Sequence, residues 1–371
     1  TSEPDHGPGY WKCNSSVLDD EHLQADQSAF WTRTCNSSEE KDLAWWERCK
    51  AECKRIIIAH SQRLASNRRQ LLKELQADLA YAQKRSAVSD PGLFNDHINR
   101  LKGEIQQVLD HRFEGARIRS KVRYMDSEEK PTKTFQYTEK TKAGKACIKT
   151  LNGPNGPVIK QDDIVKEVHS FYSDLFKNEN VDDSLSAYFL DELPRLTAEQ
   201  AKTCDGPVTF SECLTALNAM KNEKSPGSDG LTKEFYMQYF QLFGQVFVKV
   251  INKSMEDGKL SETQRLGFIT LICKDAANSE NLQNWRPISL LNVDYKIIAK
   301  VLENRLREVL PVLVDPDQTC SVSGRSIIDN LHLIRNIQDY CSARNITCYV
   351  VSYDQKKAFD YVNHKFLFKV L

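Results

Sequence analysis

The sequence predicts a helix-rich α+β protein. Apolar residues recur at three- and four-residue steps through 41–87 and again through 93–113, which is the spacing of amphipathic helices. Two short apolar runs, 266–273 and 348–354, have the length and composition of buried strands. Helices and strands do not alternate regularly along the chain, so the pattern favours α+β over a doubly wound parallel sheet.

With 371 residues the chain has room for two or three domains and a sizeable core. Its 40% apolar and 27% charged residues are ordinary for a globular protein and exclude wholesale disorder. The sequence shows no apolar run long enough to span a membrane. The start at Thr1 without a signal peptide predicts a piece of a longer protein or an incomplete gene model, intracellular (nuclear or cytoplasmic) and with reduced thiols.

The net charge of zero hides an uneven distribution. Residues 1–40 carry a net charge of −6 and residues 151–371 a net charge of −4, whereas residues 41–150 have 24 basic and 14 acidic side chains, a net charge of +10. A basic middle region between acidic flanks predicts a polyanionic partner. A solvated helical face rich in Lys and Arg explains the same numbers, so the charge alone does not decide.

The first part of the chain, up to residue 40, is expected to be poorly structured, because it is rich in Asn, Ser, Asp and Gly and poor in apolar residues. Residues 41–113 are expected to form a helical hairpin that turns at 89–92. A helical interaction module of the coiled-coil type is the competing interpretation, although the heptads are short and irregular. Cys49 and Cys53, one helical turn apart, are expected to be core thiols, since no further ligand completes a metal site.

Residues 112–150 interleave basic and aromatic side chains, which suits a surface that follows a nucleic-acid backbone and stacks bases. Lysine-rich loops of ordinary enzymes have a similar composition. The turn at 152–157 is expected to end this region. The candidates for nucleic-acid binding are Arg117, Arg119, Lys121, Arg123, Lys130 and Lys133.

From about residue 160 the pattern is mostly helical, with strands in a few places. Thr209 and Glu212 form a capping box that predicts the start of a helix. The strand at 266–273 ends at Lys274, and the strand at 348–354 ends at Asp354, just before another helix. Further helices are expected near 164–171, 214–220, 235–246, 295–310 and 327–342, and loops at 225–230 and 323–326.

Four residues, Lys274, Arg286, Asp354 and Phe359, have the chemistry of a site for phosphate and metal. Lys274 and Arg286 lie on either side of a hairpin-like loop, where a point charge and a bidentate guanidinium suit a polyphosphate. Asp354 has the chemistry to hold Mg²⁺ against the same phosphates, and Phe359 to pack beside a sugar. Each residue also has an ordinary explanation: a strand-end charge, a surface ion pair, a helix N-cap and a core aromatic, respectively.

The order of these features resembles one family, the reverse transcriptases of non-LTR (LINE-type) retrotransposons. The resemblance extends over nearly the whole chain and rests on several separate motifs in the family's order. The motifs are KSPGSDGL (224–231), EFY (234–236), LICK (271–274), WRPISLLN (285–292), YK (295–296), QT (318–319), GRSI (324–327), DN (329–330) and DQKKAFDYVNH (354–364). Upstream, FEGARIRS (113–120) and EKPTK (129–133) are similar to the basic extension before the fingers, WW (45–46) to the linker, and GPGYWKCN (7–14) to the end of the family's endonuclease.

The resemblance implies a role for each candidate. Asp354 matches the first metal-binding aspartate of the palm, Lys274 and Arg286 match finger residues on the incoming triphosphate, and Phe359 matches the bulky residue that checks the sugar 2′ position. Two Mg²⁺ ions, template RNA, a DNA primer and deoxynucleoside triphosphates are the implied cofactors and partners, with no membrane.

The resemblance also implies a domain order. Residues 1–40 would be the endonuclease tail, 41–113 the linker hairpin, 114–160 the RNA-binding extension, and 161–371 the fingers and a partial palm. The family's second Asp-Asp motif does not occur before Leu371, so the chain is expected to be a truncated polymerase fragment that is inactive alone. The alternative is a protein that retains only RNA or single-strand binding, without catalysis.

Overall fold

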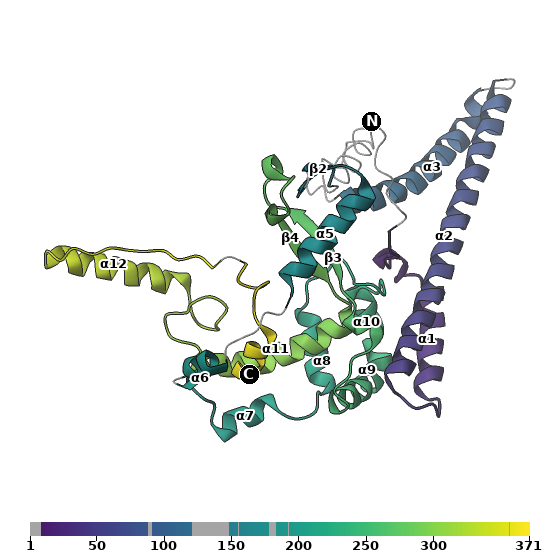
Figure 1. The fold of residues 1–371 in the computed structure, drawn as a ribbon. Coiled ribbons are helices and arrows are strands. Elements are labelled where there is room, and N and C mark those ends of the chain that lie inside the picture. Colours follow the sequence, from purple (N-terminus) through teal and green to yellow (C-terminus); the bar gives the residue numbers. More distant parts are fainter. Residues whose placement is uncertain are drawn as a thin grey trace.

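The computed structural model describes residues 9–87, 91–120, 148–154, 156–177, 183–191, 193–355 and 357–371, with the backbone alone at 91–93, 111–120, 183 and 185. A helical body carries a long helical hairpin on one side and helix α12 on the other (Figure 1). The predicted helix-rich α+β architecture is confirmed, because the helices of the described residues are accompanied by two small two-stranded sheets. No helix in this part of the chain is long and apolar enough to cross a bilayer.

The main core is built by segments far apart in the sequence. Its elements are η1 (Ser15–Val17), α1 (Glu21–Cys35), α2 (Leu43–Ser86), α8 (Phe210–Ala219), α9 (Lys233–Glu256), α10 (Glu262–Arg265) and α11 (Val293–Leu313). Aromatic rings fill its centre: the ring centroids of Trp31 and Phe243 lie 4.6 Å apart, and those of Trp46 and Phe247 lie 4.9 Å apart. Rings of this size bury more apolar surface per residue than any other side chains, so they dominate the stability of the body.

The expectation that the segment up to residue 40 is poorly structured is wrong for its described part, residues 9–40. Asp20 caps α1 by accepting the amide of Leu23 at 2.9 Å, and both Leu23 and Trp31 are almost completely buried. Apolar residues are few in this segment, but those present meet side chains of α9, which the sequence alone does not place beside them.

The long helices expected at 41–87 and 93–113 are α2 and α3 (Pro91–Ser120), which run side by side in the hairpin (Figure 1). Asp42 caps α2 by accepting the amide of Trp45 at 2.7 Å. The first half of α2 lies in the main core. Its outer half pairs with α3 through a small separate cluster of Leu75, Ala82, Ile98 and Leu101.

Two antiparallel hairpins and a helix form a second, smaller layer. The elements are β1 (Leu151–Gly153), β2 (Gly156–Val158), α5 (Gln161–Leu175), β3 (Phe268–Cys273), η2 (Ala276–Asn278), η3 (Leu282–Asn284) and β4 (Trp285–Leu290). A buried cluster of Leu151, Ile164, Leu282 and Trp285 holds the β3–β4 hairpin against α5 and β1.

In the C-terminal part of the chain the described residues form helices and no sheet. Its elements are α12 (Ile327–Ala343) and α13 (His364–Val370). Two further short helices, α6 (Asp183–Asp191) and α7 (Ala198–Cys204), lie between α5 and α8 in the chain. The predicted strand at 348–354 is wrong: the segment returns along α12 in an extended course but pairs with no other strand of the described residues. A strand needs a neighbouring strand to hydrogen-bond its backbone amides and carbonyls. The pattern of apolar side chains in the sequence does not show whether such a neighbour is present.

Candidate functional site

The β3–β4 hairpin displays two cations on one exposed face. In its register Ile272 lies opposite Arg286, and the Lys274 amide donates to the Asn284 carbonyl at 2.8 Å, which continues the ladder. Opposed side chains share a face and alternate along each strand, so Lys274, Ile272 and Arg286 point to the same side. Ile288 shares this face. All four side chains are exposed, and neither cation forms an ion pair with a described residue.

The opposite face of the hairpin is anchored to the protein. Leu271 and Cys273 pack against the cluster that contains buried Trp285. The Trp285 indole Nε1 donates to the Ser279 carbonyl at 2.8 Å, and the Tyr172 hydroxyl on α5 donates to the Trp285 carbonyl at 3.2 Å. Because this face is fixed, the backbone that carries Lys274 and Arg286 is held in place against the rest of the protein.

The loop between the two strands is fixed by its own side chains. Asp275 accepts the Ala277 amide at 3.0 Å, and Asn281 accepts the Gln283 amide at 2.9 Å. Such local caps replace the hydrogen bonds that a free loop would make to water. The loop therefore limits how far the two cation-bearing strand ends can move relative to each other.

A tight loop before α9 lies against the start of α11. Asn292 Oδ1 accepts the Asp229 amide at 3.2 Å, and a Cβ at Gly227 would lie only 2.1 Å from that oxygen. Gly230 has a φ of +78°, and a Cβ there would lie 2.2 Å from the Trp11 carbonyl oxygen. Glycine is therefore required at both positions, because the N-terminal segment and α11 approach the loop backbone closely.

A buried charge cluster joins this loop to helix α2. Lys50 Nζ lies 2.9 Å from Asp294 Oδ2, 2.8 Å from Glu47 Oε1 and 3.8 Å from Asp229 Oδ2. Asp294 is completely buried and also accepts the Trp46 indole N–H at 3.0 Å. The sequence motifs did not reveal this cluster. Its one signal in the sequence is that Lys50 lies a helical turn after Trp46, within the apolar stripe of α2.

The cluster shifts the protonation of its members. Burial alone would lower the pKa of Lys50, but the carboxylates of Asp294, Asp229 and Glu47 raise it, so the ammonium stays charged. Burial, followed by the negative charge of Asp294, raises the pKa of Asp229 to about 7. Asp294 has the shorter contact with Lys50, so Asp229 bears the cost of two carboxylates sharing one cation.

Stability should therefore depend on pH through Asp229. A folded-state pKa above the unfolded value means that the contribution of this group is present at low pH and is lost as the pH rises through about 7. Asp229→Asn retains an acceptor for the Leu231 amide and removes the titration. We expect the free energy of unfolding of Asp229→Asn, relative to the wild type, to increase from pH 5 to pH 8 by at most about 1.4 kcal/mol per pH unit. Urea unfolding at four pH values measures this, and a constant difference would contradict it.

Asp354 lies in the extended segment and is exposed. Three residues later, Lys357 Nζ lies 4.6 Å from the centroid of the Phe171 ring on α5. Lys357 and Phe171 share a small cavity of about 210 Å³ with Tyr361. Three chain steps span at most about 10 Å, so Asp354 lies within that distance of Lys357, backbone to backbone.

The segment after Asp354 also approaches the base of β4. Burial raises the pKa of Tyr172, and the negative charge of Asp360 raises it further, which places Asp360 near the tyrosine that hydrogen-bonds Trp285. The predicted helix containing Phe359 is wrong, because residues 357–361 form turns and α13 begins only at His364. Phe359 is 96% exposed, so it is not a core residue.

The remaining site candidates are not brought together. Arg117 and Arg119 lie on the α3 backbone without described side chains, and the candidates at 121, 123, 130 and 133 lie outside the described residues. Among the residues that the structure describes, no three acidic, His or Cys side chains gather in a way that suits a metal ion. Cys49 and Cys53 are buried free thiols, as predicted.

Comparison with known proteins shows what the chain is similar to. Residues 274–371 match the family model described as reverse transcriptase (RNA-dependent DNA polymerase). Over 366 residues the chain is 29% identical to the transposon TX1 uncharacterized 149 kDa protein of Xenopus laevis, an alignment that covers 98% of this chain and 28% of that protein. The matched segment therefore has the sequence of a reverse-transcriptase domain, and the relative is a transposon protein. Both findings bear out the LINE-type reverse transcriptase inferred from the motifs.

Two further relatives come from Popillia japonica and Drosophila melanogaster. The Pol polyprotein from type-1 retrotransposable element R2 of Popillia japonica is 28% identical over 165 residues, 44% of this chain and 22% of that protein. The Pol polyprotein from type-2 retrotransposable element R2DM of Drosophila melanogaster is 24% identical over 147 residues, 40% of this chain and 13% of that protein. The chain spans less than a third of the length of each of these relatives.

Proposed function

We propose that the exposed face of the β3–β4 hairpin binds the triphosphate of the incoming deoxynucleotide during RNA-directed DNA synthesis. One observation carries this proposal: the strand register places Lys274 and Arg286 on the same free face, without a protein partner among the described residues. Arg307, by contrast, is a surface cation with a carboxylate neighbour, Glu303.

The two cations have complementary chemistry. The Arg286 guanidinium can donate two parallel hydrogen bonds to phosphate oxygens, and the Lys274 ammonium acts as a compact point charge. Ile272 and Ile288 on the same face offer apolar contact to a sugar or base. Phosphate binding in reverse transcriptases is followed by attack of the primer 3′-hydroxyl, so this face would hold the nucleotide rather than react with it.

For the divalent metal, the described residues supply one candidate ligand, Asp354. Reverse transcriptases use divalent metal, and Asp354 is an exposed carboxylate on the segment that returns toward β4. A two-metal site needs several anionic ligands, and in the described part of the chain no three carboxylate, His or Cys side chains gather in a way that suits a metal ion. These residues therefore do not fit a two-metal site by themselves. We propose Asp354 as one Mg²⁺ ligand and Phe359 as a residue beside the sugar.

The triphosphate proposal is tested by equilibrium binding of a fluorescent deoxynucleoside triphosphate to this chain. We expect Arg286→Gln to weaken binding about tenfold, which corresponds to about 1.4 kcal/mol for the loss of a charged bidentate contact. Arg307→Gln removes a surface arginine of α11 and is the matched control, with no expected change. Equal affinities for the two variants would overturn the proposed role of this face.

We propose that the basic region at 112–150 binds template RNA. The support is compositional: the stretch 41–150 carries a net charge of +10, and Arg117 and Arg119 lie on the last part of α3. Reversing the charge of Arg117, Arg119 and Lys121 should weaken binding of single-stranded RNA and flatten its dependence on salt. The log–log slope should fall by roughly 0.7 for each phosphate that the protein no longer neutralises.

Fluorescence anisotropy across a salt series measures this effect. The matched control reverses Arg68, Arg69 and Lys73, which are exposed on the outer half of α2 and make the same change in net charge. RNA affinity that falls equally in both triple variants would show a general charge effect and contradict a site at 112–150.

A further inference from the structure

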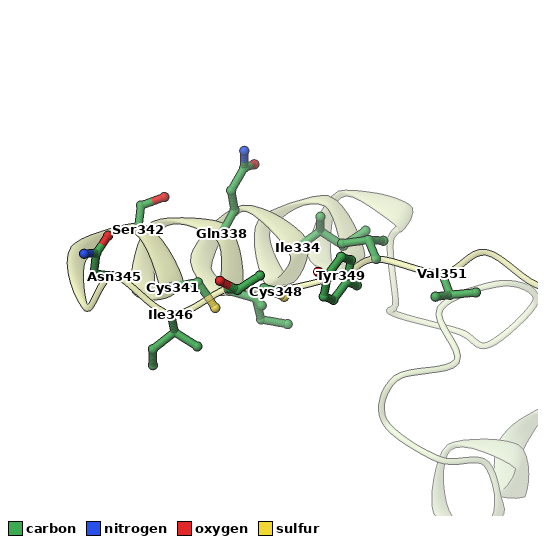
Figure 2. A pocket seen from close by; sticks show the side chains of 12 residues that line it. Ile334, Gln338, Cys341, Ser342, Asn345, Ile346, Cys348, Tyr349 and Val351 are labelled. Carbon is green, nitrogen blue, oxygen red and sulfur yellow. The ribbon is translucent and has the colours of Figure 1, made fainter.

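Two cysteines face each other beside the segment that leads to Asp354. Cys341 lies in the last turn of α12, and Cys348 lies on the extended segment that returns along this helix. Both line one cavity of about 690 Å³, together with Ile334, Ile337 and Val351. Figure 2 shows the two sulfur atoms on the side of α12 that the returning segment covers.

The chain reversal between the two cysteines is fixed by backbone hydrogen bonds. The Ile346 amide donates to the Cys341 carbonyl at 2.9 Å, and Asn345 adopts a φ of +58°, a common way for a helix to end. Cys348 follows this reversal by two residues and lines the same cavity as Cys341. The reversal therefore brings the Cys348 side chain back beside α12.

The two thiols are close enough to affect each other. Desolvation raises the pKa of Cys341, and the adjacent Cys348 thiol raises it further. Cys348 is exposed and Cys341 half-buried, so a small oxidant can reach the pair. The segment that carries Cys348 pairs with no strand of the described residues, so its backbone is free to make the small adjustment that a disulfide requires.

We propose that Cys341 and Cys348 form a reversible disulfide that ties the segment leading to Asp354 to helix α12. With oxidised glutathione as the oxidant, the Cys348 thiolate attacks one glutathione sulfur, which breaks that disulfide and releases one glutathione thiolate. The Cys341 thiolate then attacks the Cys348 sulfur and releases the second glutathione. Two protein thiols lose two protons and two electrons, and one glutathione disulfide is reduced to two thiols.

The other thiols of the chain provide contrasts. Cys320 is exposed, and its side-chain contact is with the Ser321 hydroxyl rather than with a second thiol, so oxidised glutathione should leave it as a mixed disulfide. Cys49 and Cys53 are only four positions apart, but they are buried; burial raises the pKa of Cys49 to about 12 and that of Cys53 well above its usual value. They should not pair while the protein is folded.

The test is peptide mapping of the whole chain after treatment with oxidised glutathione, alkylation and trypsin digestion without reduction. Cleavage after Arg335, Arg344 and Lys356 puts Cys341 and Cys348 on separate peptides with one cysteine each. We expect these two peptides to be linked in most molecules and released by dithiothreitol, whereas the Cys320 peptide carries glutathione. Cys348→Ser should abolish the linked species and leave Cys341 unpaired or glutathionylated.

A second arm separates folded geometry from mere proximity in the sequence. In denaturant, Cys49 and Cys53 should pair at least as readily as Cys341 and Cys348, whereas in the folded chain only the latter pair should form. Glutathione on both Cys341 and Cys348, or equal pairing of the two couples in the folded chain, would overturn the proposal.

Discussion

Lys50→Met should lower the free energy of unfolding of this protein by about 3–5 kcal/mol. The substitution keeps most of the length of the side chain but removes the cation that lies 2.9 Å from fully buried Asp294 and 2.8 Å from Glu47. The Trp46 indole N–H, 3.0 Å from Asp294, cannot compensate the charge that is left. An uncompensated buried carboxylate is among the costliest defects a folded protein can carry.

Urea unfolding followed by tryptophan fluorescence measures this loss. The control is Arg48→Met, two residues earlier on α2, whose guanidinium lies 3.5 Å from Glu39 with both side chains more than half exposed. Surface pairs of this kind contribute at most about 1 kcal/mol. Adding Asp294→Asn to Lys50→Met should recover part of the loss, because no buried charge then remains at that position. Equal destabilisation by Lys50→Met and Arg48→Met would show that the cluster does not hold α2 to the body.

The second large effect concerns the nucleotide. Replacing both Lys274 and Arg286 by Gln should weaken binding of a deoxynucleoside triphosphate about a hundredfold, roughly 2.7 kcal/mol, because both charge-assisted hydrogen-bonding groups are removed. Folding should change little, since both side chains are exposed and neither has an ion pair within the described residues. The anchoring face of the hairpin, with Trp285 at its centre, is untouched.

The control for this double variant is Lys300→Gln together with Arg307→Gln. Both residues lie on α11 and pair with Glu303. Their replacement removes two positive charges, as the replacement of Lys274 and Arg286 does, so the net charge of the chain changes by the same amount. Nucleotide affinity should stay within about twofold of the wild type in this control. An equal loss in both double variants would indicate long-range attraction rather than a site.

Periodicity and capping rules predicted much of the fold. The capping box at Thr209 and Glu212 is present, with Thr209 Oγ1 accepting the Glu212 amide at 3.2 Å. The strand ending at Lys274 and the long helix α2 lie where apolar spacing indicated them. These features depend on residues a few positions apart, which is the range over which a single sequence carries direct physical information.

The failures involve partners that are distant in the sequence. Leu23 and Trp31 are too few to form a core of their own, and they are buried because α9 folds over them. The apolar run before Asp354 has the composition of a strand, but a strand also requires a neighbouring backbone, and none of the described residues supplies one. Lys50 looks like an exposed helical lysine until Asp294, from α11, is placed against it.

The candidate site was partly predictable for the same reason. Motif order identified Lys274 and Arg286, and the loop between them is short enough for the hairpin register to be local. Metal ligation by Asp354 depends on further carboxylates, and the described residues nowhere gather three ligands that suit a metal ion. Sequence motifs therefore located the candidate phosphate-binding side chains, while the three-dimensional arrangement decided that both point to one face.

The most direct test of the account compares a deoxynucleoside triphosphate with the unphosphorylated deoxynucleoside. Isothermal titration of the wild-type chain with each ligand should show a strong preference for the triphosphate, and the Lys274→Gln, Arg286→Gln double variant should lose most of that preference while its affinity for the nucleoside is unchanged. A double variant that still prefers the triphosphate as strongly as the wild type would contradict phosphate binding by this face of the hairpin.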